Sequence, residues 1–197
     1  NNIKNKDKIG KYFMDHPKFN LGYLKYPKLD IINKLELKKK NDLFFFHGIS
    51  LKKEIQLKNK ILNSYVRFEK SNNKISRFLD KINIPIFKNI IKIKNTYKVR
   101  MFCEMMPNIN NSIISKKNKT LVSLQPSKID YKTIKFLTNK IKYFFSLKPN
   151  KEINLNYKNI VDRAKGASHH MGGLRFNPNK DLSVVDKNLK IVGLKKI

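Results

Sequence analysis

The sequence His-His-Met-Gly-Gly-Leu-Arg at residues 169–175 decides how this chain is best interpreted. It places two of the four histidines beside two of the seven glycines. Imidazole titrates near neutral pH, with an ordinary pKa of about 6.5, so histidine is the usual candidate for moving a proton. Adjacent glycines let a backbone approach a flat ligand or adopt a positive φ angle. The pairing predicts a reaction centre, although an isolated His-His-x-Gly-Gly string is also typical of a polar loop.

The composition is that of a folded protein. With 197 residues, 40% hydrophobic and 11% aromatic, the chain is long and apolar enough to bury a substantial core. No apolar run approaches the roughly 18 residues of a membrane span. The single cysteine, Cys103, excludes an intrachain disulfide and favours a reducing, cytoplasmic location. The start lacks a methionine and an apolar signal region, so we expect a chain entered in the middle.

The formal net charge of +30 would ordinarily direct attention to nucleic acid. However, only five of the 44 basic residues are arginine, the residue that contacts phosphate and guanine through two parallel hydrogen bonds. Lysine, asparagine and isoleucine are abundant throughout, as an AT-rich coding sequence would produce. We therefore expect no specific nucleic acid partner, and a basic nucleic-acid-binding protein remains the alternative function.

Local patterns predict the elements of the first half. Pro17 moves His16 out of helical geometry, and this local context favours a structural histidine. Strands and loops are expected over 18–58, with His47 in a turn and Phe44–Phe46 packed into a core. Apolar spacing over 51–81 predicts one helix and then a second, before Ile-Pro-Ile at 84–86 interrupts the pattern; the residues concerned are Ile55, Leu57, Ile61, Leu62, Tyr65, Val66 and Phe68, then Ile75, Phe78 and Leu79.

In the second half, residues 97–104 predict a strand in which Cys103 is a buried structural thiol. After a Pro-Asn turn, the strand at 112–115 is expected to lie antiparallel to it, and 121–124 forms the next strand. Asp130 is expected to cap a helix that Pro149 ends, with a short helical turn over 159–165. The apolar face of that helix carries Ile134, Leu137, Ile141, Phe144 and Phe145.

Three segments together resemble the glucose–methanol–choline (GMC) family of flavin-dependent alcohol oxidoreductases. His-x-Met-Gly-Gly-x-Arg, followed by Val-Val-Asp at 184–186 and Leu-Lys-Ile-x-Gly-Leu at 189–194, resembles the C-terminal signature of that family. Residues 9–17, Ile-Gly-Lys-Tyr-Phe-Met-Asp-His-Pro, are similar to a stretch that follows its flavin-binding part. Residues 104–115 resemble a substrate-domain pattern, in which Met105 here replaces a glutamine and Ile113 an arginine.

The resemblance implies an α+β fold in which an antiparallel sheet with flanking helices forms a substrate-binding lobe. It implies that residues 1–25 leave the FAD lobe, 26–160 form the substrate-binding lobe, and 161–197 hold the catalytic histidine loop and begin the return to the FAD lobe. The Rossmann-like FAD lobe itself is expected to be largely absent, since the chain has no Gly-x-Gly-x-x-Gly fingerprint. The chain is accordingly expected to be a fragment whose second catalytic residue lies outside it.

The resemblance also assigns roles at the site. It implies FAD as cofactor, an alcohol or sugar as substrate, and His169 as the general base that also binds the substrate. His170, Met171, Gly172 and Gly173 would contact the flavin. Arg175 would bind substrate or position the loop, with a structural salt bridge as the open alternative. Asp186 is expected to cap a turn, and no metal site is expected. The substrate and the electron acceptor, whether oxygen, a quinone or a cytochrome, stay open.

Overall fold

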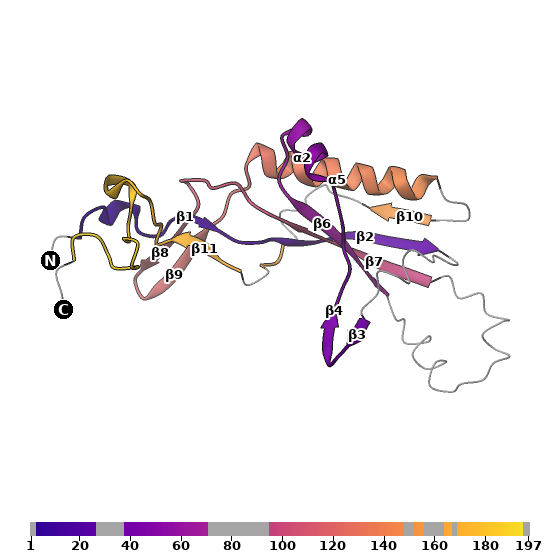
Figure 1. Ribbon diagram of the computed structural model, residues 1–197, viewed down its shortest axis with the longest axis horizontal. Coiled ribbons are helices and arrows are strands. Elements are labelled where there is room, and N and C mark those ends of the chain that lie inside the picture. The colour runs from indigo at the N-terminus through magenta and orange to yellow at the C-terminus, as the bar shows by residue number, and fades with distance from the viewer. Residues whose placement is uncertain are drawn as a thin grey trace.

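In the part of the chain that it describes, a computed structural model shows two larger antiparallel sheets, a separate two-stranded hairpin and one long helix (Figure 1). The structure describes residues 3–26, 38–70, 95–147, 152–155, 164–166 and 169–194. The coarse prediction of an α+β fold with antiparallel sheets is confirmed. None of the helices in these ranges is long and apolar enough to cross a membrane.

The larger sheet has five strands in the order β10-β2-β7-β6-β5. Its members are β2 (Lys18–Tyr26), β5 (Ile49–Ser50), β6 (Ser64–Lys70), β7 (Asn95–Cys103) and β10 (Glu152–Leu155). Side chains alternate between the two faces of a strand, so each strand contributes every second residue to the core. In β6, Val66 and Phe68 are fully buried, and in β7 the same holds for Val99 and Met101. The opposite face of this sheet carries polar and aromatic side chains.

Helix α5 (Lys128–Ser146) covers the apolar face of this sheet, and the short helix α2 (Lys53–Asn59) lies beside α5 (Figure 1). Its apolar stripe of Ile134, Leu137, Ile141 and Phe145 is buried, as the 3.6-residue spacing predicts. Phe145 meets Phe68 of β6 edge to face, with 5.5 Å between the ring centroids. The predicted helix is therefore confirmed, although Phe144 lies at its exposed margin.

The cap of α5 differs from the prediction. Ser127 is the N-cap, and its hydroxyl accepts a hydrogen bond from the Asp130 amide at 3.2 Å. Asp130 is the third residue of the helix, and its carboxylate accepts a hydrogen bond from the Ser127 amide in return. This reciprocal capping box satisfies two amides that have no partner within the helix. The prediction of Asp130 as the N-cap is wrong, because serine and aspartate are both favoured at N-caps and the sequence does not show which of the two residues precedes the helix.

The smaller sheet has the order β11-β1-β8-β9 and lies beside the first (Figure 1). It comprises β1 (Lys11–Met14), β8 (Ser112–Lys116), β9 (Lys119–Ser123) and β11 (Met171–Gly173). The prediction that the strands around 97–104 and 112–115 pair is wrong, because β7 pairs with β2 and β6 whereas β8 pairs with β1 and β9. The loop between β7 and β8 crosses from one sheet to the other. The strand expected over 121–124 is confirmed as part of β9.

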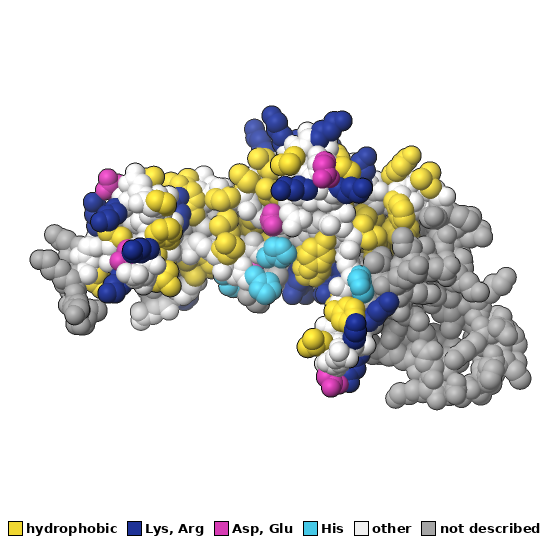
Figure 2. All heavy atoms as spheres, viewed as in Figure 1, with side chains coloured by type: hydrophobic (Ala, Val, Ile, Leu, Met, Phe, Trp, Pro, Cys, Tyr) yellow, Lys and Arg dark blue, Asp and Glu magenta, His cyan; other side chains and the backbone are white. Residues whose placement is uncertain are grey.

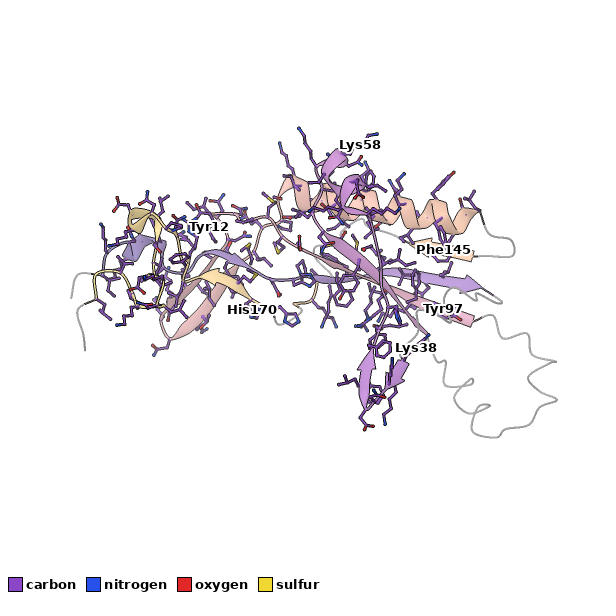
Figure 3. The ribbon with its side chains drawn as sticks, in the orientation of Figure 1. Tyr12, Lys38, Lys58, Tyr97, Phe145 and His170 are labelled. Atoms are coloured by element: carbon purple, nitrogen blue, oxygen red, sulfur yellow. The ribbon has the colours of Figure 1, made fainter. Side chains whose placement is uncertain are left out.

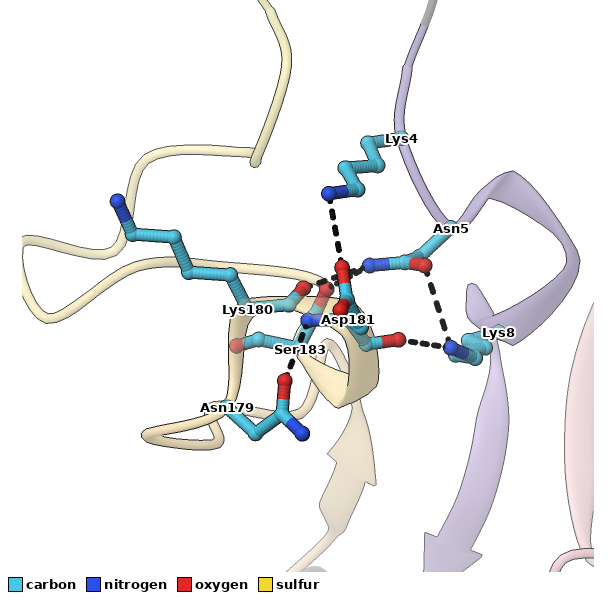
Figure 4. Close-up of polar contacts among 7 residues, drawn as sticks. All are labelled: Lys4, Asn5, Lys8, Asn179, Lys180, Asp181 and Ser183. Atoms are coloured by element: carbon cyan, nitrogen blue, oxygen red, sulfur yellow. Dashed lines mark hydrogen bonds and ion pairs between the residues drawn. The ribbon is translucent and has the colours of Figure 1, made fainter.

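The ends of the described chain pack against one another. The segment around the short 3-10 helix η1 (Lys6–Lys8) contacts the loop around η3 (Lys180–Leu182), as Figure 4 shows. The Asn5 side-chain amide donates to the carbonyls of Lys180 and Ser183, at 2.9 and 2.7 Å. Lys4 pairs with the Asp181 carboxylate at 2.8 Å. These contacts fix the C-terminal loop beside the smaller sheet.

Two further predictions are wrong in the first half of the chain. Residues 53–59 are helical as predicted, but residues 64–70 form strand β6 and not a helix. Phe44–Phe46 are not in a core: the hairpin of β3 (Lys38–Lys40) and β4 (Leu43–Phe45) forms its own two-stranded sheet and projects from the body (Figure 1). Phe44 is 68% exposed there. His47 lies in the loop after this hairpin, as expected.

Some predictions fall outside the described residues. These are the second helix with Ile75, Phe78 and Leu79, the Ile-Pro-Ile interruption at 84–86, Pro149, and the greater part of the helical turn expected over 159–165.

Candidate functional site

The candidate site lies at the junction of the two sheets, where several segments from distant parts of the sequence meet. Asp15, His16 and Pro17 join β1 of the smaller sheet to β2 of the larger one. The Lys18 and Lys165 backbones bond to each other in both directions, at 2.9 and 3.0 Å. Strand β11 then pairs with β1 through Met171 and Met14. His169 therefore lies between two points at which the backbone is fixed, Lys165 on one side and Met171 on the other.

Three histidines gather at this junction. The rings of His16 and His169 meet edge to face, with centroids 6.5 Å apart, and His16 also stacks on Phe102 at 6.4 Å. His170 stacks on Phe13 at 5.3 Å between centroids. In Figure 2 most of the cyan histidine atoms collect near the middle of the molecule, next to basic and hydrophobic side chains, and Figure 3 shows His170 beside the end of β11. The neighbouring residues His169 and His170 thus lie close to His16, which is near the other end of the sequence.

Asp15 organises this cluster. Its carboxylate accepts a hydrogen bond from the His16 amide at 2.7 Å, which fixes the backbone before Pro17. The other carboxylate oxygen lies 3.9 Å from His170 Nε2. This side chain is only 7% exposed, whereas that of His170 is 56% exposed. His170 is therefore directed toward Asp15 and Phe13, whereas His169 faces the open clefts.

Two clefts meet at His16 and His169. The first, of about 520 Å³, is mainly apolar. Its lining consists of Met14, Asp15, His16, Glu104, Met105, Pro107, His169 and Met171. Glu104 accepts hydrogen bonds from the Asn63 amide and side chain, at 3.3 and 3.4 Å. This cleft combines apolar surface with a carboxylate near two imidazoles.

The second cleft, of about 310 Å³, opens on the polar face of the larger sheet. It is lined by His16, Lys18, Tyr65, Arg67, Arg100, Phe102 and His169. Because both clefts share His16 and His169, a ligand that extends from one into the other would pass both imidazoles. A neutral imidazole in that position can accept a proton from a bound hydroxyl group.

The glycine pair has a structural function at this point. Gly172 and Gly173 adopt φ angles of +83° and +73°, in the left-handed region that favours glycine. A Cβ atom on Gly172 would lie 1.9 Å from the carbonyl oxygen of Tyr12, so β1 and β11 can approach only if this residue has no side chain. Gly172 is nevertheless exposed on its other side, next to the exposed Met171. Their assignment to flavin contact stays a prediction.

Arg175 lies away from the two clefts. Its guanidinium is 4.4 Å from the centroid of the Tyr12 ring, and it donates to the Leu182 carbonyl at 2.9 Å. These contacts hold the loop after β11 against β1, which is the loop-positioning function considered for this residue. Neither cleft has Arg175 in its lining. Its binding of substrate therefore stays a prediction without a contact to support it.

The residues that would meet FAD can be compared with this geometry. His169, His170, Met171 and Gly172 are exposed along one edge, and Met171 is 67% exposed beside the apolar cleft. The missing Cβ of Gly172 does not widen this edge for a ligand, because its place is occupied by the Tyr12 carbonyl of β1. The described residues include no glycine-rich turn before a helix, the element that holds a pyrophosphate. Contact between these residues and FAD therefore stays a prediction.

Two other residues singled out from the sequence lie outside the site, as expected. Cys103 is buried, and desolvation, followed by the charges of Asp130 and Glu104, raises the pKa of its thiol far above the usual range. Asp186 accepts hydrogen bonds from the amides of Asn188 and Lys190, at 2.8 and 2.9 Å, and so caps a turn. These backbone bonds, that of Lys190 foremost, lower the pKa of Asp186.

Sequence reasoning missed the contribution of the central strands. Tyr65 and Arg67 were not assigned to the site because β6 was interpreted as a helix, and Arg100 was not because its pairing partner in β6 was unknown. An alternating pattern was present at 64–69, in which Ser64, Val66 and Phe68 are buried and the residues between them face the cleft. His16 was interpreted as structural because its role depends on His169, which local sequence cannot bring near it.

The chain was compared with known proteins. No protein-family model matches it, and the comparison with curated proteins gives no match. Within the described ranges, no three His, Cys, Asp or Glu side chains are grouped so that they could hold a metal ion. The chemistry of the site therefore has to be inferred from the clefts themselves and from the motif resemblance.

Proposed function

We propose that this chain is part of an FAD-dependent oxidoreductase that oxidises a CH–OH group of an alcohol or sugar, with His169 as general base. The observation that carries the proposal is the meeting of His16 and His169 at the boundary of two clefts. Both residues come from segments that resemble GMC sequences, and those segments lie about 150 positions apart in the chain. The finer assignment to a GMC substrate lobe, with residues 161–197 beginning the return to a Rossmann-like lobe, belongs to the same proposal.

Each of the three histidines at the junction has a separate role in the proposed reaction. Oxidation of an alcohol by hydride transfer requires the hydroxyl proton to leave as the hydride leaves carbon. His169 would accept that proton, and such a base is worth about 10²–10⁴ in rate. His16 lies edge-on to His169 and could donate or accept a hydrogen bond at the same hydroxyl. His170, close to Asp15, would fix the backbone that carries His169.

FAD, when bound, would supply the two-electron acceptor that receives the hydride. The exposed edge of Met171 and Gly172 is the part of this chain that would contact its ring. The apolar cleft between Met14, Met105 and Met171 would exclude water from the reacting carbon. Since the pyrophosphate site is not provided by the described residues, we expect the isolated chain to retain little flavin and to show no turnover.

The test uses the protein in which this chain is joined to its flavin-binding lobe. We expect His169→Asn to reduce kcat by about 10²–10⁴ while the bound flavin spectrum is kept. His47→Asn is the matched control, because His47 lies in the loop beside Phe45 and lines neither cleft. Turnover of the His169 variant within a few-fold of the control would overturn the proposal. So would a reading frame that encodes this chain without any Gly-x-Gly-x-x-Gly turn.

A further inference from the structure

The polar face of the larger sheet concentrates positive charge beside the two histidines. Arg67 of β6 and Arg100 of β7 are directly opposite each other in the antiparallel register. Lys18, at the start of β2, lines the same cleft. Like charges at directly opposed positions of a sheet destabilise it. The fold therefore bears an electrostatic cost at this point that core packing does not explain.

Glu69 compensates only part of that charge. One of its carboxylate oxygens pairs with the Arg67 terminal nitrogen at 2.5 Å, and the other lies 2.9 Å from Arg100 Nε. A single negative charge thus serves two guanidinium groups, and Lys18 adds a further positive charge. Although Arg100 Nε is close to Glu69, it is buried and makes no well-aligned hydrogen bond to any described residue. This buried nitrogen is nevertheless paired with Glu69, and the case for a ligand rests on the charge that one carboxylate leaves uncompensated.

The second cleft, here called the basic cleft, is lined by the stacked aromatic rings of Tyr65 and Phe102 as well as by the arginines. The rings of Tyr65 and Phe102 stack at 4.8 Å between centroids and 6° between planes. Arg67 lies over Phe102 at 5.0 Å and over Phe46 at 4.1 Å. The Arg67 and Arg100 side chains are only 20% and 32% exposed. Their positions are therefore set by packing, unlike those of the lysines scattered over the surface.

The acidic groups near the histidines lie on the other side. Asp15 and Glu104 line the apolar cleft, together with His16 and His169, and neither lines the basic one. Glu69 is the acid paired with the arginines of the basic cleft. An anion at the junction would consequently be drawn to the basic side and repelled from the apolar side.

We propose that the basic cleft binds an anionic group of the substrate, a carboxylate or a phosphate, through Arg100, Arg67 and Lys18. This inference rests on the proposed function, because it places the reacting CH–OH group at His169 and the charged end on the arginines. Guanidinium groups suit such anions because they can donate two parallel hydrogen bonds. The substrate class is then an acidic or phosphorylated alcohol, such as a sugar acid or a sugar phosphate. A neutral alcohol would leave the arginines without a partner.

Calorimetric titration of the 197-residue chain tests this without any flavin, at about 0.15 M salt to screen the general positive charge. Gluconate is compared with neutral sorbitol, and glycerol 3-phosphate with neutral glycerol. We expect at least one anion to bind about tenfold or more tightly than its neutral counterpart, and the pair that does so identifies carboxylate or phosphate as the ligand. Because no turnover is measured, failure of the oxidoreductase proposal leaves this result intact.

Three variants make the test specific. Arg100→Gln should weaken anion binding about tenfold or more, whereas Lys58→Gln, which removes an exposed charge on α2, should leave it unchanged. Glu69→Gln should strengthen it several-fold, because it removes the competing carboxylate, and an increase cannot arise from misfolding. Equal binding of anions and neutral analogues would overturn the inference. Equal losses for Arg100→Gln and Lys58→Gln would do the same, as would weaker binding by a folded Glu69→Gln variant.

Discussion

Replacement of Asp130 by alanine should destabilise the fold and loosen one wall of the candidate site. This carboxylate is 4% exposed and accepts two backbone hydrogen bonds, from Ser127 N at 2.5 Å and from Met106 N at 2.9 Å. The first closes the capping box of α5. The second fixes the loop that carries Glu104 and Met105 into the apolar cleft. One side chain thus ties the start of the helix to the wall of the cleft.

The magnitude follows from these two bonds. A hydrogen bond to a charged group contributes about 1.5–3 kcal/mol, and an amide left buried without a partner has a comparable cost. Asp130→Ala removes both bonds, so we expect the free energy of unfolding to fall by about 3–5 kcal/mol. Asp130→Asn keeps one acceptor oxygen and should lose about half of that. Against a total stability of about 5–15 kcal/mol, the alanine variant would be close to the limit of folding.

Urea unfolding followed by circular dichroism measures these differences through the midpoint and the slope. Asp42→Asn is the control, since Asp42 is exposed and pairs with the exposed Lys39 on the β3–β4 hairpin, and it should change stability by less than about 0.5 kcal/mol. The reasoning would be refuted if Asp130→Ala lost no more stability than Asp42→Asn. It would also be refuted if the asparagine variant were less stable than the alanine variant.

Two further predictions concern the smaller sheet and its C-terminal loop. Gly172→Ala should prevent β11 from pairing with β1, because its Cβ would lie 1.9 Å from the Tyr12 carbonyl oxygen. Gly173→Ala meets only ordinary contacts, so its free energy of unfolding should fall by about 1–2 kcal/mol because of the positive φ. Thermal unfolding of both variants distinguishes them, and equal losses of stability would contradict the close-approach argument. The hydrogen bond and charge of Lys4 lower the pKa of Asp181 below its ordinary value of 3.8, so this carboxylate stabilises the fold above that pH and ceases to do so as the pH falls through its folded pKa. In Lys4→Gln the pKa of Asp181, measured by NMR titration, should rise toward 3.8, and an unchanged value would show that this ion pair does not form.

The sequence predicted those parts of the fold that depend on the spacing of apolar residues within a single segment. Helix α5 was predicted because nineteen residues repeat one apolar face, and Cys103 was predicted to be buried because it lies within an apolar strand. Strand β6 was missed because Ile61, Leu62, Tyr65, Val66 and Phe68 fit helical spacing as well as strand alternation. The pairing of β7 with β2 and β6 depends on contacts across the whole chain, which no local pattern encodes.

The candidate site was predicted only in part, for the same reason. The motif at 169–175 indicated His169, and the structure directs that residue toward both clefts. Its partners come from the β1–β2 connection, which lies within the motif-like stretch 9–17, and from the middle strands, where no motif marks Tyr65, Arg67 or Arg100. Arg67 and Arg100 could be recognised only after their opposed register was known.

The division of the site between the two sheets has a consequence for how the protein matures. The smaller sheet and its connections contribute the imidazoles, and the larger sheet contributes the guanidinium groups and the aromatic floor. His16 and His169 lie near opposite ends of the sequence. Their contact closes a long loop of chain, and contacts of this kind form slowly during folding. Both segments must therefore be synthesised before this junction can form. Contact between His16 and His169 would then report completed folding and not the presence of either sheet alone.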